Sequence, residues 1–297
     1  MKIFLNAGFC EPLHPEVGFR CQTVAHGDRT GLAVNDEHAM IATLAKDTLQ
    51  YFDDAVFVVG GWDWREGGKL IQKRNADLEP MKVHLAKQCE SLIAEWGANG
   101  GDTSKLWIDF GNELDGSYWK NHLDAFYRTA MVSYERVRSI SNQVHFVTGS
   151  TMNFNKEPLW KRGGFEVLEE LCRLSWPADT IQGLHPYRGG GRFWPSFDSE
   201  GEALDELRRV LRGRKLAITE MGWASGTGHS DEAIADMTRL EIEMWRHFGA
   251  LCYVGYQVQD APAPGNSGES GGFGAFSNVV DGLTEKPWAA AMREARA

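Results

Sequence analysis

Residues 105–113 read KLWIDFGNE, and this stretch decides the expected fold. It is an almost continuous apolar run that ends in Gly111, Asn112 and Glu113. Parallel strands that are buried on both faces have this kind of sequence, because neither face meets solvent. Residues 215–220, KLAITE, show the same pattern and end in Glu220. Both stretches therefore predict a buried parallel strand with a glutamate at its carboxyl end.

Similar apolar runs recur along the chain and alternate with helical periodicity. The eight expected strands are Lys2–Gly8, Gly18–Val24, Ala55–Gly60, Lys105–Phe110, Gln143–Thr148, Thr180–Leu184, Lys215–Thr219 and Cys252–Val258. The expected helices are Asp36–Phe52, Asp77–Trp96, Tyr118–Arg138, Phe165–Leu174, Glu200–Arg212, Asp231–Phe248 and Lys286–Ala295. This alternation predicts an α/β fold, a (β/α)8 TIM barrel, for which ~250 residues is a typical length. We expect residues 1–297 to form a single catalytic domain.

A doubly wound open sheet is the main alternative fold. Such sheets commonly carry a G-x-G-x-x-G turn after the first strand or a phosphate-binding P-loop, and the chain has neither motif. The glycine- and proline-rich stretch Ala261–Gly274 follows the last expected strand. It predicts a long loop on the face of the barrel where active sites lie.

The composition excludes several classes of partner. The chain is 42% apolar and 24% charged, as is usual for a soluble globular protein. Its net charge of −10 and the lack of a basic stripe argue against nucleic acid, which requires clustered Lys and Arg. No apolar run is long enough to span a membrane. The first residues resemble a strand rather than a signal peptide, which predicts a cytoplasmic protein; secretion stays open if a signal was removed or export is non-standard.

Metal and cofactor motifs are also missing from the sequence. The five cysteines are scattered without a C-x-x-C pair, so we expect reduced and mostly buried thiols. Only Cys10 and Cys21 are close enough in sequence to suggest a local disulfide. The nine histidines are dispersed, with neither His-x-His nor His-Glu-x-x-His. We therefore expect neither a metal nor a cofactor.

The two strand-end glutamates carry the expected chemistry. Catalytic groups of a barrel come from the carboxyl ends of different strands. A single glutamate in such a place is usually a solvated turn residue, but Glu113 and Glu220 end the fourth and the seventh expected strands. Glycoside hydrolysis needs two carboxyl groups that flank one bond, one protonated and the other ionised. If the reaction retains the configuration of the sugar, the two groups should lie ~5–5.5 Å apart.

The neighbours of both glutamates make a family resemblance specific. Asn112-Glu113 and Thr219-Glu220 resemble clan A of the (β/α)8 retaining glycoside hydrolases, which includes cellulases, β-xylosidases and β-1,3-glucanases. The resemblance implies that Glu113 is the general acid/base and Glu220 the nucleophile. It also implies that Asn112 hydrogen-bonds the sugar 2-OH beside the reacting carbon.

Two further segments strengthen the resemblance. His185-Pro186-Tyr187, at the end of the sixth expected strand, is similar to the His-x-Tyr element of the clan. That element implies that both side chains line the sugar subsite and that the Tyr187 hydroxyl contacts the nucleophile. A hydrogen-bonded interior histidine is the alternative interpretation of His185. The ending, Gly274–Ser277 followed by Glu285–Trp288, also resembles the loop and last helix of the clan.

Further candidates for substrate contact follow the other strands. Many clan members carry a Trp at the end of the eighth strand, where this chain has Tyr256 and Gln257. Arg20 is the candidate for an arginine that is common near the second strand, although it could equally pair with an internal carboxylate. Arg188 and Arg192 flank three glycines, and this segment could contact an acidic sugar or form a mobile loop. The remaining candidates are Trp62, Asp63, Trp119, Trp194 and Trp223, whose rings would either pack on sugar faces or anchor loops.

The sequence thus predicts a retaining glycoside hydrolase that cleaves β-glycosidic bonds of an oligo- or polysaccharide by double displacement, with endo action. A metal-dependent barrel hydrolase and a non-catalytic carbohydrate-binding barrel are the alternatives. The first lacks its usual histidine motifs, and the second would normally have lost one of the two carboxylates. A serine hydrolase would be expected to use Gly-x-Ser-x-Gly, and Gly149-Ser150 lacks the required flanks. The sugar, its linkage and the oligomeric state are not encoded in any recognisable pattern.

Overall fold

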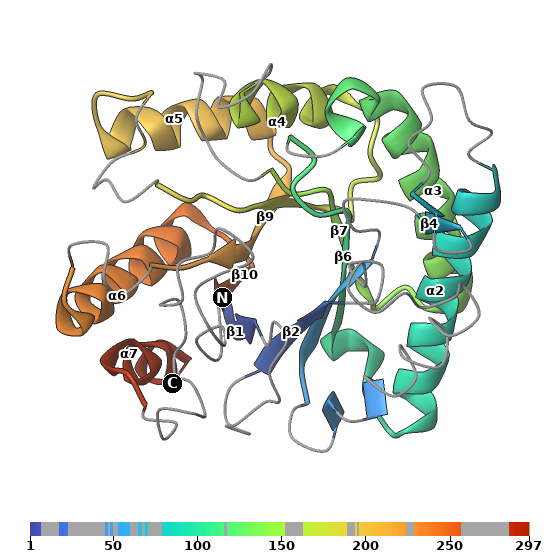
Figure 1. Cartoon of the computed structure of the whole chain (residues 1–297), viewed down its shortest axis with the longest axis horizontal. Helices are drawn as coiled ribbons and strands as arrows, with labels where there is room; N and C mark the ends of the chain where they lie inside the picture. The colour runs from blue at the N-terminus through green and yellow to red at the C-terminus, as the bar shows by residue number, and fades with distance from the viewer. Residues whose placement is uncertain are drawn as a thin grey trace.

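The computed structural model describes residues 1–6, 18–22, 45–46, 48–49, 53–59, 65–66, 69–70, 79–115, 118–151, 163–188, 194, 196–223, 229–256 and 285–296. Eight parallel strands within these ranges close into a barrel (Figure 1). In order around the barrel they are β1 (Lys2–Asn6), β2 (Gly18–Gln22), β3 (Ala55–Val59), β6 (Leu106–Phe110), β7 (His145–Thr148), β8 (Ile181–Leu184), β9 (Lys215–Met221) and β10 (Cys252–Tyr256). The strand β10 then pairs with β1 and completes the ring.

Helices surround the strands and alternate with them in sequence (Figure 1). They are α2 (Glu79–Ala98), α3 (Leu123–Ile140), α4 (Gly164–Arg173), α5 (Glu200–Leu211), α6 (Asp231–Phe248) and α7 (Pro287–Arg296). Two short 3-10 helices, η2 (Thr103–Lys105) and η3 (Tyr118–Asn121), precede β6 and α3. The last helix, α7, packs against α6 and β1, so it covers the place where the barrel closes. Among the described residues, no helix is long and apolar enough to cross a membrane.

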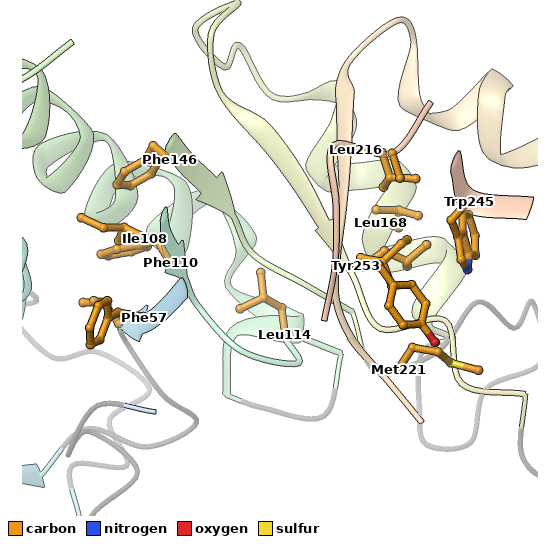
Figure 2. Packing of buried hydrophobic residues seen from close by; sticks show 14 of the residues in the cluster. Phe57, Ile108, Phe110, Leu114, Phe146, Leu168, Leu216, Met221, Trp245 and Tyr253 are labelled. Carbon is orange, nitrogen blue, oxygen red and sulfur yellow. The ribbon is translucent and has the colours of Figure 1, made fainter. Parts of the chain in front are cut away.

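The strands are apolar on both faces because each face packs into a separate core. One core lies inside the barrel and consists of Phe4, Val56, Trp107, Val147, Ile181, Ala217, Cys252 and Val254. The other lies between strands and helices, and Figure 2 shows part of it, with Phe57, Ile108, Phe110 and Phe146 near β6 and with Leu216, Met221, Tyr253 and Trp245 near β9 and β10. Successive residues of a strand therefore alternate between two apolar environments.

The expected barrel is confirmed, and every expected strand is present with its start or end shifted by at most two residues within the described ranges. Two differences matter. The strand β9 extends past Thr219 to Met221, so Glu220 lies within it. The helix expected from Tyr118 is divided, because the 3-10 turn η3 ends at Asn121 and His122 leaves the helical region before α3 begins.

The remaining features are a small ribbon, the first expected helix and the cysteines. A two-stranded antiparallel ribbon, β4 (Arg65–Glu66) with β5 (Lys69–Leu70), was not predicted. Of the expected helix Asp36–Phe52, the described residues 45–46 and 48–49 are helical. Cys89 and Cys172 are buried free thiols, as expected. Cys10, the side chain of Cys21 and the Ala261–Gly274 loop lie outside the described part of the structure.

Candidate active site

A tight turn at the end of β6 carries Glu113 into the mouth of the barrel. Gly111 has φ of 91° and Glu113 has φ of 45°, so both lie in the left-handed region that residues other than glycine rarely adopt. At Gly111 a Cβ atom would come within 2.5 Å of the Phe126 ring, so only glycine fits. The backbone N–H of Glu113 donates to Ser150 Oγ at 3.3 Å, and that of Leu114 donates to the Ser150 carbonyl at 2.8 Å. The strained turn is thus fastened to the segment that follows β7.

A register irregularity in β9 directs Glu220 toward the barrel axis. Between Ile218 and Met221, β9 advances three residues while the facing part of β10 advances two. In a regular strand Glu220 would point away from the face that carries Thr219. The extra residue returns Met221 to the outer core, as Figure 2 shows, and leaves Thr219 and Glu220 both with partners inside the barrel mouth. Such bulges are known to re-aim side chains beside active sites.

His185 lies between the two glutamates and has no solvent exposure. Its Nδ1 atom is 3.3 Å from Glu113 Oε1 and 4.0 Å from Glu220 Oε1. Its other ring nitrogen, Nε2, is 3.1 Å from Thr219 Oγ1, and its backbone N–H donates to the Thr151 carbonyl at 3.0 Å. The ring is therefore held at both nitrogens, with one of them facing the two carboxylates.

Tyr187 supplies the second contact to Glu220. Its hydroxyl donates to Glu220 Oε1 at 3.0 Å. Burial, and after it the negative charge of Glu220, raises the pKa of Tyr187 well above its ordinary value. The hydroxyl therefore keeps its proton and acts as a donor to the carboxylate across the physiological pH range.

The two carboxylates are buried and close together. Glu113 is 8% exposed and Glu220 is 7% exposed. One ligand atom from each of Glu113, His185 and Glu220 lies within 4.8 Å of the others. This spacing is near the ~5–5.5 Å of retaining glycosidases and well below the ~6.5–9.5 Å that leaves room for a water in inverting ones. The same three side chains are also a group that could bind a metal ion.

The structure brings two of the other expected site residues, Asn112 and Tyr256, to this region. Asn112 precedes Glu113 and is 4% exposed. Tyr256, the last residue of β10, is close enough to Tyr187 for its charge to affect the Tyr187 pKa. The remaining expected residues cannot be placed in the same way: Arg20 is on β2 but its side chain is not described, and Trp62, Asp63 and Gln257 lie outside the described residues.

Three of the candidate tryptophans lie in the described part of the chain, and all three are largely buried. Trp119 is 7% exposed and meets Phe126 edge-on, and Trp223 is 8% exposed beside His229. Trp194 is 1% exposed and its Nε1 donates to the Pro186 carbonyl at 3.0 Å. Its position favours the other expectation, that it anchors the segment after β8.

Arg188 begins the segment that was expected either to contact an acidic sugar or to form a mobile loop, and its side chain pairs with a buried carboxylate. Residues 189–192 lie outside the described part of the chain. Arg188 is 6% exposed and its Nε lies 2.7 Å from Glu241 Oε1 on α6. Sequence reasoning missed this buried ion pair because the adjacent glycines suggested an exposed loop. The available signal was that Glu241 falls on the buried face of α6, between Thr238 and Trp245.

Comparison with known proteins identifies this architecture. Neither a protein-family model nor a curated protein matches the sequence. Among solved structures, a GH5_18 from Bifidobacterium longum subsp. infantis matches over 100% of this chain and 78% of its own, with a TM-score of 0.67 and 13% identity. A GH5_18 variant from Streptomyces cattleya, in complex with Manβ1-4GlcNAc, matches over 94% and 71%, with a TM-score of 0.64 and 12% identity. Endoglucanase Cel5A from the hyperthermophilic Thermotoga maritima matches over 100% and 97%, with a TM-score of 0.59 and 14% identity. At these identities the likeness concerns the fold, and the chain has the (β/α)8 barrel of these proteins.

Proposed function

We propose that the protein is a retaining glycoside hydrolase that cleaves β-glycosidic bonds of an oligo- or polysaccharide. The observation that carries the proposal is the pair of buried carboxylates, Glu113 after β6 and Glu220 on β9, with oxygen atoms within 4.8 Å. These are the fourth and seventh strands of the barrel, and both side chains reach its mouth from the carboxyl ends, where barrel enzymes keep their active sites.

In the first step, Glu220 attacks the anomeric carbon while Glu113 gives its proton to the leaving glycosidic oxygen. The glycosidic bond breaks and an ester forms between the sugar and Glu220. In the second step, Glu113 takes a proton from water, and the resulting hydroxide attacks the same carbon. The ester bond breaks, Glu220 leaves as a carboxylate, and the sugar keeps its original configuration.

The contacts around the carboxylates support these roles. The Tyr187 hydroxyl donates to Glu220, which stabilises the ionised form that a nucleophile requires. His185 Nδ1 lies nearer to Glu113 than to Glu220, and Thr219 fixes the opposite side of the ring. Asn112, beside Glu113, is proposed to bind the sugar 2-OH. The closeness of the carboxylates favours direct attack by Glu220 over activation of a water molecule.

A β-linked glycan is the proposed substrate class. One structural neighbour is in complex with Manβ1-4GlcNAc, another is described as an exo-β-1,4-mannosidase from an Opitutaceae bacterium, and a third as an endoglucanase. This range covers both exo and endo action. We propose endo cleavage because the sequence predicts a long loop at Ala261–Gly274 and contains 11 tryptophans. Trp62, Trp223, Tyr256 and Gln257 remain candidates for sugar contact.

The decisive experiment measures both turnover and stereochemistry. Purified protein is screened on aryl β-glycosides, on Manβ1-4GlcNAc, and on β-linked manno- and cello-oligosaccharides. Proton NMR of the first product formed should show the β-anomer before it mutarotates. An α-anomer would mean inversion and would remove the nucleophile role from Glu220, whereas binding without any turnover would favour the non-catalytic alternative.

A metal-dependent hydrolase is a second candidate, because Glu113, His185 and Glu220 could together bind a cation. The proposed mechanism does not use one. Activity should therefore be unchanged after dialysis against EDTA. Loss of activity that returns with added Zn²⁺ or Mn²⁺ would favour the metal-dependent mechanism instead.

A further inference from the structure

A buried ion pair lies directly beside Tyr187 in the sequence. The side chains of Arg188 and Glu241 are 5% and 4% exposed, and Arg188 Nε lies 2.7 Å from Glu241 Oε1. Arg188 Nη1 also donates to Glu200 Oε2 at 3.1 Å. Glu200 begins α5 and Glu241 is in the middle of α6, so one arginine after β8 is tied to both helices that flank β9 in sequence (Figure 1).

Two tryptophans complete a cage around the pair. The Arg188 guanidinium lies 4.1 Å from the centre of the Trp194 ring, and Trp194 Nε1 donates to the Pro186 carbonyl at 3.0 Å. On the other side, Trp245 Nε1 donates to Glu241 Oε2 at 2.9 Å. The residues immediately before and after Tyr187 are therefore both anchored, Pro186 through Trp194 and Arg188 through Glu241.

Stability alone gives little reason for such a pair. Removing two charges from water is costly, and well-packed apolar side chains of similar volume often stabilise a protein as much or more. The pair does, however, have a geometric effect. The two neighbouring side chains have different partners: Arg188 contacts the helices, while the Tyr187 hydroxyl reaches Glu220.

We propose that Arg188 and Glu241 are positioning residues, which hold the Tyr187 hydroxyl against Glu220 by clamping the chain on the helix side. The inference rests on the proposed role of Glu220 as nucleophile. A small displacement of a positioning group can lower the rate strongly, because the transition state requires close alignment. The pair thus contributes to turnover although it lies outside the substrate site.

A second arginine provides a matched control at the opposite end of β8. Arg214, just before β9, donates from Nη1 to Gln182 Oε1 at 2.9 Å and from Nη2 to Thr148 Oγ1 at 2.8 Å. It is also largely buried and also ties neighbouring strands together. Its partners Gln182, Thr148 and Thr180 are other than Glu220, the hydrogen-bond partner of the Tyr187 hydroxyl, so we expect its removal to lower stability and leave the pH–rate profile in place.

The test uses the double substitution Arg188→Met with Glu241→Gln, which removes both charges and keeps the volume. We expect kcat to fall by about 10-fold or more in the wild-type background and by less than about 2-fold in a Tyr187→Phe background. The acidic limb of the pH–rate profile should move to higher pH in both the double variant and Tyr187→Phe. Arg214→Met should lower Tm and leave the pH profile in place. Equal losses of kcat in the two backgrounds, or an unchanged kcat, would overturn the proposal.

A measurement that needs no activity separates this proposal from the proposed function. The seven tyrosines can be labelled with 3-fluorotyrosine, and Tyr187→Phe assigns one fluorine resonance. That resonance should shift in the double variant, and in the isosteric single variant Glu241→Gln if the double variant does not fold, but not in Arg214→Met. An unmoved resonance overturns the positioning role even if the enzyme is active. A shifted resonance in a protein without glycosidase activity would support the clamp and reject the proposed hydrolase.

Discussion

The ends of β6 and β9 each place a buried glutamate at the barrel mouth, but they do so by different backbone devices. Glu113 is outside the strand, on a turn with a left-handed backbone that Ser150 holds in place. Glu220 is inside the strand, at a bulge where β9 gains one residue on β10. Regular strands alternate their side chains, so aiming two carboxylates at one point required a local distortion at each strand. The first device stores backbone strain, whereas the second depends on strand register.

Substitution of each glutamate by alanine gives the largest expected difference. Glu220→Ala should lower kcat by at least about 10⁴-fold on every substrate, because no covalent intermediate can form. Glu113→Ala should lower kcat by about 10²–10⁴-fold on poor leaving groups and much less on dinitrophenyl glycosides, which need no proton. The ratio of kcat on dinitrophenyl and nitrophenyl glycosides measures this contrast. Wild-type activity in either variant would reject its assigned role.

The helix side of β9 should also show a pH dependence of stability. Burial raises the pKa of Glu241 to about 7, although Arg188 opposes this, and Glu200, Trp245 and Tyr253 are its other titratable or polar neighbours. Between about pH 4.5 and pH 7 the folded chain keeps a proton that the unfolded chain has released. The free energy of unfolding should therefore fall as pH rises through this window, by at most about 3 kcal/mol.

Urea unfolding of the wild type and of Glu241→Gln at several pH values isolates this contribution. The stability difference between the two proteins should change between about pH 4.5 and pH 7 and be constant above and below this window. Glu200→Gln is a second test, because the charge of Glu200 helps to raise the Glu241 pKa and its removal should move the pH window of the wild type toward lower pH. A curve for Glu241→Gln that is parallel to that of the wild type would contradict the raised pKa.

The fold and the two glutamates could be predicted from sequence, because buried parallel strands leave continuous apolar runs and both carboxylates end such runs. The bulge in β9 could not be predicted, because a strand that is buried on both faces has no polar face to mark its register. Residues 216–221 are buried on both faces and Leu216, Ala217 and Ile218 are all apolar, so the hydrophobic pattern does not reveal a shift of one residue. In an alternating strand the shift would have been visible, because it would move polar residues to the wrong face.

The environment of Trp194 and of Arg188 was also beyond sequence reasoning. Both follow β8 near a run of glycines, a pattern typical of an exposed loop. Their actual partners, Trp245 and Glu241, are on α6, far along the chain. Local pattern carries no information on such distant pairs, so the same residues that suggested a sugar contact proved to be part of the packing between β8 and α6.

The smallest expected effect tests the two backbone devices directly. At position 113 the left-handed φ of 45° favours glycine, so the Glu113→Gly variant should be more stable than Glu113→Ala by about 1 kcal/mol. At position 220, within β9, the order should reverse, and Glu220→Gly should be less stable than Glu220→Ala by about 0.5–1 kcal/mol. All four variants lack one of the two carboxylates, and urea unfolding compares their stability independently of activity. If glycine is favoured at both positions, then Glu220 does not have a regular strand backbone. If it is favoured at neither, then Glu113 does not have a left-handed backbone. Either result would reject the contrast between backbone strain after β6 and strand register in β9.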